Sequence, residues 1–127
     1  MAAGKIIKRE GSVATVSHQR VSKAFIELAT FVIMQMSREM QGFLSFRQVV
    51  IESVARLPLD DESLCRLLEH YDPARFLGDH NVAVGLSANE RIIVDKAKQA
   101  LQARLGRRCV ILDVMTLALI AQAESYD

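Results

Sequence analysis

The chain has 127 residues, half of them apolar and 24% charged, with a formal net charge of +1. This length fits one domain or two very small ones, and this balance excludes a wholly disordered chain. No apolar run approaches the roughly 20 residues that span a bilayer, and the N-terminal stretch lacks the apolar core of a secretory signal. We therefore expect a cytoplasmic protein. Its two cysteines have no metal-ligand spacing and predict buried, reduced thiols, with no metal site and no cofactor.

The first half of the chain predicts a strand followed by two helices. Residues 13–17 form a short β-prone run. Residues 20–40 then predict a helix, because apolar residues recur at helical spacing: Val21, Phe25, Leu28 and Val32. Ser45 is placed to cap a second helix over residues 46–57.

An acidic connector is expected over residues 58–80. This stretch holds both prolines and six acidic residues against two basic ones, so the remainder of the chain carries a charge of +5. One short helix is predicted inside it, capped by Asp60 or Asp61. Three leucines would face inward from that helix: Leu64, Leu67 and Leu68.

The second half of the chain predicts the same order of elements. A strand is expected in residues 81–87, where three apolar residues alternate with small ones: Val82, Val84 and Leu86. Ser87 and Glu90 match the S-x-x-E capping box, and the helix that they begin runs to Gly106. Residues 112–123 are nearly all apolar, so we expect a helix buried on most sides.

Two strand–helix–helix units in one chain solve a packing problem. A single unit leaves an unpaired strand edge and an open apolar face, whereas two units pair their strands antiparallel and close one core. We therefore expect one compact, mainly α domain over residues 1–127, with units at 11–57 and 81–125. The strands align with Ser17 against Ser87, and the second helices align with Val49 against Val114. Because these two alignments differ in offset, the first long helix is expected to be longer than its counterpart.

This order resembles that of the ribbon-helix-helix DNA-binding proteins. The segments that carry the resemblance are VAVGLS for the strand, ANERIIVDKAKQALQARLG for the first helix, RRCVILDVMTLALIAQAE for the turn and second helix, and LSFRQVVIESVARL for the second helix of the first unit. Members of that family usually carry one unit per chain and dimerise. Two fused units resemble the accessory DNA-binding proteins of bacterial conjugation and plasmid transfer.

The resemblance implies a set of DNA-contacting residues. Alternate strand residues would face the bases in the major groove: Val13, Thr15, Asn81, Ala83 and Gly85. The other strand residues would face the core: Ala14, Val16, Val82, Val84 and Leu86. Phosphates would be held at the starts of the two second helices and by nearby basic groups: Ser45, Arg47, Arg107 and Arg108, with Lys5, Lys8 and Arg9 in an N-terminal tail. The implied partner is double-stranded DNA, in transcriptional control or in assembly of a DNA-transfer complex.

Other interpretations of the same residues stay open. Arg107 and Arg108 also fit a solvated turn at a helix C-terminus, and the basic tail also fits a solubilising segment. The chain could instead be a helical protein-interaction module or antitoxin-like domain that binds a protein partner through a surface rich in Met and Phe: Met34, Met36, Met40, Phe25, Phe31 and Phe43. The chain has no P-loop, nucleophile elbow, GxGxxG or HExxH motif, so we expect no enzymatic activity.

Overall fold

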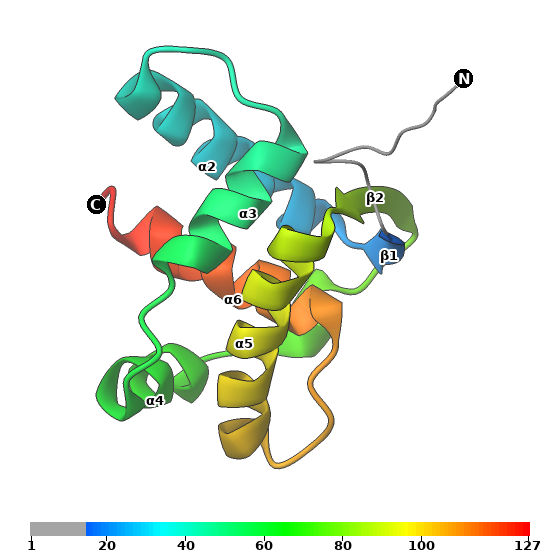
Figure 1. Cartoon of the computed structure of the whole chain (residues 1–127), viewed down its shortest axis with the longest axis vertical. Helices are drawn as coiled ribbons and strands as arrows, with labels where there is room; N and C mark the ends of the chain where they lie inside the picture. Colours follow the sequence, from blue (N-terminus) through cyan, green and yellow to red (C-terminus); the bar gives the residue numbers. More distant parts are fainter. Residues whose placement is uncertain (1–14) are drawn as a thin grey trace.

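A two-stranded antiparallel sheet joins the two halves of the chain (Figure 1). The computed structural model describes residues 15–127. The elements in chain order are β1 (Thr15–Val21), α2 (Lys23–Met40), α3 (Phe46–Arg56), α4 (Asp61–Glu69), the 3-10 helix η1 (Pro73–Phe76), β2 (His80–Leu86), α5 (Ala88–Leu105) and α6 (Ile111–Glu124). The predicted mainly α fold with a short antiparallel ribbon is therefore confirmed.

The two strand–helix–helix runs match in length and spacing. Each strand has 7 residues and each long helix has 18, so α2 is not longer than α5 and the expected alignment of Ser17 with Ser87 is wrong. The counterpart of Ser87 is Ser22, since each serine caps its helix by accepting a hydrogen bond from the third helical amide.

One alignment without gaps relates the two runs. It pairs β1 with β2 and α2 with α5 from end to end, and it pairs the first residue of α3 with the first residue of α6. The residues that end the long helices also correspond, because Gln41 with φ 57° and Gly106 with φ 71° are both left-handed. Positions paired by this alignment are called equivalent below.

The first strand ends later than expected. Within the described residues it covers 15–21, whereas the expected strand ended at Ser17, and the expected start at Val13 and Ala14 lies outside the described residues. The expected helix start at Arg20 is wrong because β1 continues to Val21 and helical geometry begins only after Ser22. Pairing with β2 accounts for this extension, because each residue of β1 finds an antiparallel partner up to Val21 opposite His80.

The register of the ribbon reverses the expected faces of β1. Thr15 lies opposite Leu86, which is 1% exposed, so Thr15 is on the inward side and its predicted outward placement is wrong. Val16 lies opposite Gly85 and is 54% exposed, so its predicted inward placement is also wrong. Because side chains alternate along a strand, an error of one residue in the inferred phase moves every side chain to the other face.

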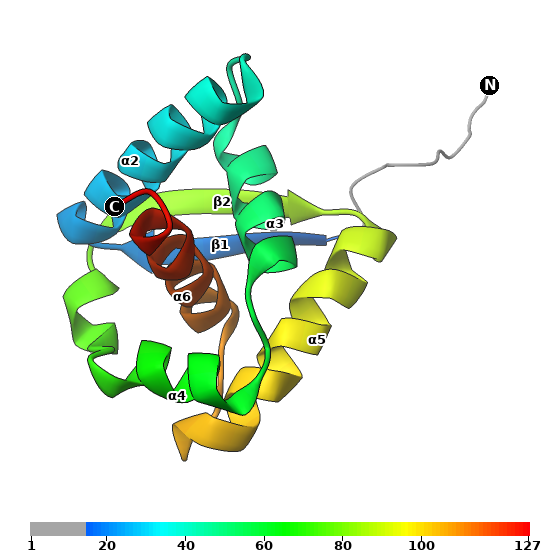
Figure 2. The same cartoon turned by 90° about the vertical axis from the view of Figure 1, so that its left-hand side faces the viewer.

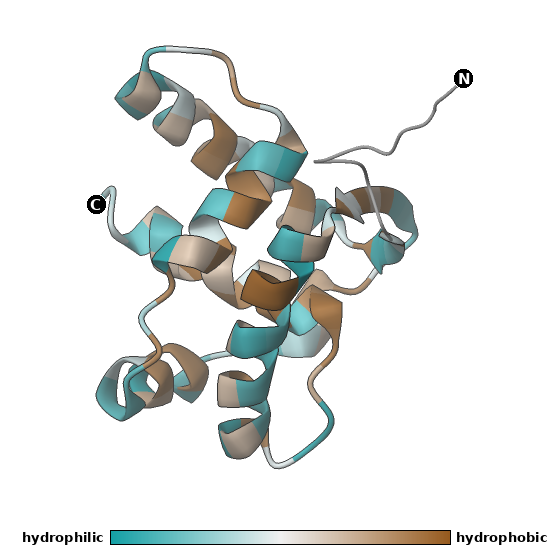
Figure 3. Ribbon diagram, viewed as in Figure 1, coloured by the Kyte–Doolittle hydropathy of each residue, from teal (hydrophilic) through white to brown (hydrophobic). Residues whose placement is uncertain are grey.

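Helix α6 forms the centre of the core, as its apolar sequence predicts. Every residue from 112 to 119 is buried, and α6 packs against α2, α3, α4 and α5. Figure 2 shows α6 crossing in front of the ribbon, with the other helices around it. Hydrophilic and hydrophobic residues alternate along α3 and α5 in Figure 3, which is the pattern of helices with one buried face. Their buried residues include Val49, Val54, Val94 and Leu101.

The acidic connector packs its short helix against the core and then returns to the end of β1. Asp60 caps α4 as expected, with its carboxylate accepting from the Ser63 amide at 3.0 Å, and Leu64 is fully buried. The Ser22 amide then donates to the Phe76 carbonyl at 3.0 Å. At Gly78 a Cβ would lie 2.6 Å from backbone atoms of Val21 and Ser22, so only glycine allows this close approach.

The two cysteines differ in their environment. Cys109 is buried, as expected, whereas Cys65 is exposed on α4, which corrects the prediction that both are buried. Its helix buries the side with Leu64 and turns Cys65 to solvent. Across residues 15–127, each helix is too short or too polar to cross a lipid bilayer.

Candidate nucleic-acid interface

The outward face of the ribbon carries three cross-strand pairs. Val16, His18 and Arg20 of β1 lie opposite Gly85, Ala83 and Asn81 of β2, respectively. The opposite face is anchored in the core by Val21, Val84 and Leu86, whose exposure is 1% or less. Because residues directly opposite each other in a ribbon project to the same side, the three outward pairs form one continuous surface.

Only some of the predicted strand contacts lie on the outward face of the ribbon. Asn81 and Ala83 are exposed and share the outward face with the half-buried Gly85, as the sequence predicts. Thr15 lies on the other face, and Val13 is outside the described residues.

Sequence reasoning missed His18 and Arg20, which are both exposed on the outward face. The side chain of Arg20 is 64% exposed and its guanidinium lies 3.8 Å from the carboxylate of Asp79. The signal that would have found both residues is the cap at Ser22, because aligning it with the cap at Ser87 sets the extent of β1.

The start of α3 is hydrogen-bonded to the ribbon. Ser45 and Gln48 form a capping box, which confirms the predicted N-cap. Arg47 donates from Nε to the Gly85 carbonyl at 2.8 Å and forms an ion pair with Glu90. Burial opposes ionisation of Glu90, but hydrogen bonds from Ser87 and the charge of Arg47 lower its pKa below the usual value. Arg47, a predicted phosphate contact, is therefore engaged within the protein.

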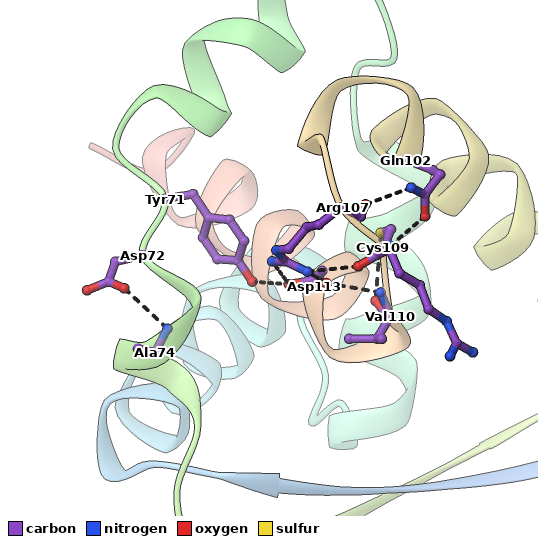
Figure 4. Close-up of polar contacts among 9 residues, drawn as sticks. Tyr71, Asp72, Ala74, Gln102, Arg107, Cys109, Val110 and Asp113 are labelled. Atoms are coloured by element: carbon purple, nitrogen blue, oxygen red, sulfur yellow. Dashed lines mark hydrogen bonds and ion pairs between the residues drawn. The ribbon is translucent and has the colours of Figure 1, made fainter.

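The start of α6 is held by a buried carboxylate in place of a capping side chain. Val110 occupies the N-cap position and has no acceptor on its side chain. Instead, the carboxylate of Asp113 accepts from the Val110 amide at 3.0 Å, from Tyr71 Oη at 2.7 Å and from both terminal nitrogens of Arg107 at 2.9 and 3.0 Å (Figure 4). Asp113 is 3% exposed. This network joins the connector, the α5–α6 turn and α6.

Charges in this network shift the acidity of its members. Burial disfavours the ionised form of Asp113, but hydrogen bonds from Arg107, Val110 and Tyr71 outweigh it and lower the pKa. Burial and the bond to Asp113 raise the pKa of Tyr71. Burial also raises the pKa of the Cys109 thiol to about 11, which makes this thiol unreactive at neutral pH.

The remaining predicted phosphate contacts have unequal access to solvent. Arg107 is committed to Asp113, whereas Arg108 is exposed beside it. Lys5, Lys8 and Arg9 lie outside the described residues. In the first turn of α3 the Gln48 amide donates to Ser45 Oγ, and in α6 the Asp113 amide donates to the Val110 carbonyl. Helix geometry leaves the first two amides of each helix without an intrahelical acceptor.

A separate apolar surface lies at the far end of α2. Met34 is 45% exposed, Met40 48% and Phe43 fully exposed, whereas Phe25 and Met36 of the predicted Met- and Phe-rich surface are buried in the core. A groove of about 610 Å³ runs between the end of α2 and the following loop, with lining residues that include Ile33, Met34, Phe43 and Leu44. The equivalent place beside α5 is a polar hollow lined by Asp95, Lys98, Gln99 and Gln102.

Within residues 15–127, there is no group of three or more His, Cys, Asp or Glu side chains placed to hold a metal ion. No protein-family model, curated protein or solved structure matches the chain.

Proposed function

We propose that the chain binds double-stranded DNA by placing the outward face of its ribbon in the major groove, as two fused ribbon-helix-helix units. The observation that carries this proposal is the set of polar readers on that face, Arg20, His18 and Asn81. The major groove admits a two-stranded β-ribbon, and arginine and asparagine are the side chains that pair bidentately with guanine and adenine. This face is richer in readers than the one predicted from the sequence.

The arrangement of the two units supports the proposal. His18 and Ala83 are equivalent positions in the two runs, and these two residues also lie directly opposite each other in the ribbon. A twofold axis through this central pair would exchange the units, as in a dimer of single ribbon-helix-helix chains. This axis would also exchange the starts of α3 and α6, where the first two helical amides could donate to phosphate oxygens.

The expected affinity is modest. Arg47 and Arg107 are committed to intramolecular ion pairs and Arg20 is assigned to the bases, which leaves Arg108, Lys5, Lys8 and Arg9 to neutralise phosphates. Since each neutralised phosphate adds about 0.9 to the salt slope, four such contacts give a slope of about 3.6. Binding should therefore weaken by tens-fold or more between about 50 and 200 mM salt.

Fluorescence anisotropy with a random duplex tests the proposal. The full chain is titrated at about 50 mM and about 200 mM salt. Replacement of Arg108 by alanine should reduce the salt slope by about 1, whereas the same change at Arg66, on α4, should have no effect. Absence of binding at the lower salt would contradict the proposal.

The exposed groove at α2 favours a second candidate function, which is binding of a protein partner. The polar composition of the equivalent hollow beside α5 indicates that folding does not require apolar side chains at this place. A photo-crosslinking amino acid at Met34, compared with one at Gln99, tests this candidate in cells. Capture of one defined protein at position 34 alone supports it, and the same products at both positions contradict it.

A further inference from the structure

The two ends of the outward ribbon face differ in chemistry. Arg20 and Asn81 lie opposite each other at one end, both exposed and both capable of donating hydrogen bonds. Val16 and Gly85 lie opposite each other at the other end, where neither side chain carries a polar atom. His18 and Ala83 separate the two ends.

A twofold reader requires matching ends. Palindromic sites arise because identical residues of two subunits meet identical bases on the two strands. The equivalent positions on this face are Val16 with Asn81, His18 with Ala83 and Arg20 with Gly85, and no pair is identical. The scaffold is therefore repeated, but the surface that would meet the bases is not.

We infer that the chain recognises a non-palindromic duplex, read through hydrogen bonds mainly in the half-site beneath Arg20 and Asn81. This inference rests on the proposed function. A guanine and a neighbouring adenine suit these two side chains. Val16 at the other end offers only apolar contact, of the kind that suits a thymine methyl group.

Arg20 is available for such a contact. Its neighbour Asp79 is fully exposed, and the pair is separated by 3.8 Å. Exposed ion pairs of this kind contribute little, so a guanine edge can compete for the guanidinium. Asp79, beside Arg20, also provides a hydrogen-bond acceptor at this end of the ribbon, which suits a cytosine amino group. At the other end, neither residue of the Val16–Gly85 pair is charged.

At the Val16–Gly85 end, the nearby polar groups are already engaged in contacts within the protein. The carbonyl of Gly85 already accepts from Arg47, and the guanidinium of Arg47 is paired with Glu90. The guanidinium beside this end is therefore turned toward the protein. The difference between the ends extends from the side chains of the ribbon to the groups that flank it.

Selection from a randomised duplex library with the full chain tests the inference. The expected motif is one-sided, with strong base preferences in one half and weak ones in the other. In R20A, one preferred position should lose about 5- to 150-fold of its discrimination, while N81A should relax a neighbouring position. R66A serves as the matched control and should keep the whole motif, whereas V16A should relax preferences in the weak half alone. Circular dichroism verifies that each variant is folded.

A palindromic motif from the native chain would overturn the inference while leaving DNA binding in place. So would R20A weakening both halves of the motif equally. Failure of the native chain to bind any duplex at about 50 mM salt is a different result, because it removes the proposed function itself and the inference with it.

Discussion

Replacement of Asp113 by alanine should destabilise the fold more than any exposed charge substitution. The carboxylate is 3% exposed and accepts four hydrogen bonds, two of them from Arg107. Alanine would leave the Val110 amide at the start of α6 without its acceptor. It would also leave the hydroxyl of Tyr71, which is half-buried, without a partner.

The expected loss is about 3 kcal/mol of unfolding free energy. Removal of one member of a buried ion pair costs about 3–5 kcal/mol, because the remaining charge stays buried without compensation. The side chain of Arg107 is 42% exposed and can regain water, which places the loss at the lower end of that range. A small domain has about 5–15 kcal/mol in total, so the loss is a substantial part of its stability.

Urea unfolding followed by far-ultraviolet circular dichroism at pH 7 measures this loss. The matched control is Glu52→Ala, which removes an exposed partner of Arg56 on α3 and should cost less than about 1 kcal/mol. The slope of the transition should stay unchanged in both variants. Equal, small losses in the two variants would refute the idea that the network holds α6 in place.

Three further predictions concern pH, backbone conformation and thiol reactivity. Folding lowers the pKa of Asp113, so the stability that its carboxylate confers is complete above the unfolded pKa of about 3.9 and is lost as the pH falls through the lower folded value. In urea unfolding at a series of acidic pH values, Asp113→Asn should therefore reduce the loss of stability with falling pH. In thermal unfolding, Gly106→Ala should cost about 1 kcal/mol and Gln41→Gly should gain about 0.5 kcal/mol, since both positions are left-handed; equal signs would contradict this. A thiol reagent should modify Cys65 in the native protein and reach Cys109 only after unfolding; rapid reaction of both would contradict the burial.

The second half of the fold was predictable because its local signals agree. The alternation before Ser87, the capping box with Glu90 and the terminal Gly106 all indicate the same boundaries, and the structure has them within one residue. The apolar run of α6 likewise predicts deep burial. These features depend on neighbours within a few residues, which sequence patterns report well.

The first strand was misplaced because its inward face is mostly polar. Thr15, Ser17 and Gln19 lie opposite Leu86, Val84 and Val82, respectively, so the apolar side of the ribbon comes almost entirely from β2. No period-two apolar pattern marks β1, and its extent is decided by pairing with a strand far away in the sequence. His18 and Arg20 were missed for this reason.

The partners of the arginines were equally hidden. Arg47 meets Glu90 across 43 residues, and Tyr71 reaches Asp113 across 42. A sequence shows that a basic residue stands near a helix start, but it does not show whether a carboxylate from another segment has neutralised it. Of the predicted phosphate contacts, Arg47 and Arg107 are paired with carboxylates of the protein, whereas Arg108 is exposed.

The two units share a backbone plan but meet its requirements with different chemistry. The start of α3 is closed by Ser45 and its capping box, whereas the start of α6 depends on Asp113 and on a tyrosine from the connector. A repeated scaffold needs equal element lengths, caps and turn conformations, because these set where the backbone goes. Outward side chains on the ribbon contribute little to packing, so folding does not explain why Arg20 and Asn81 share one end. Under the proposed function, contact with bases at that end of the ribbon explains this placement.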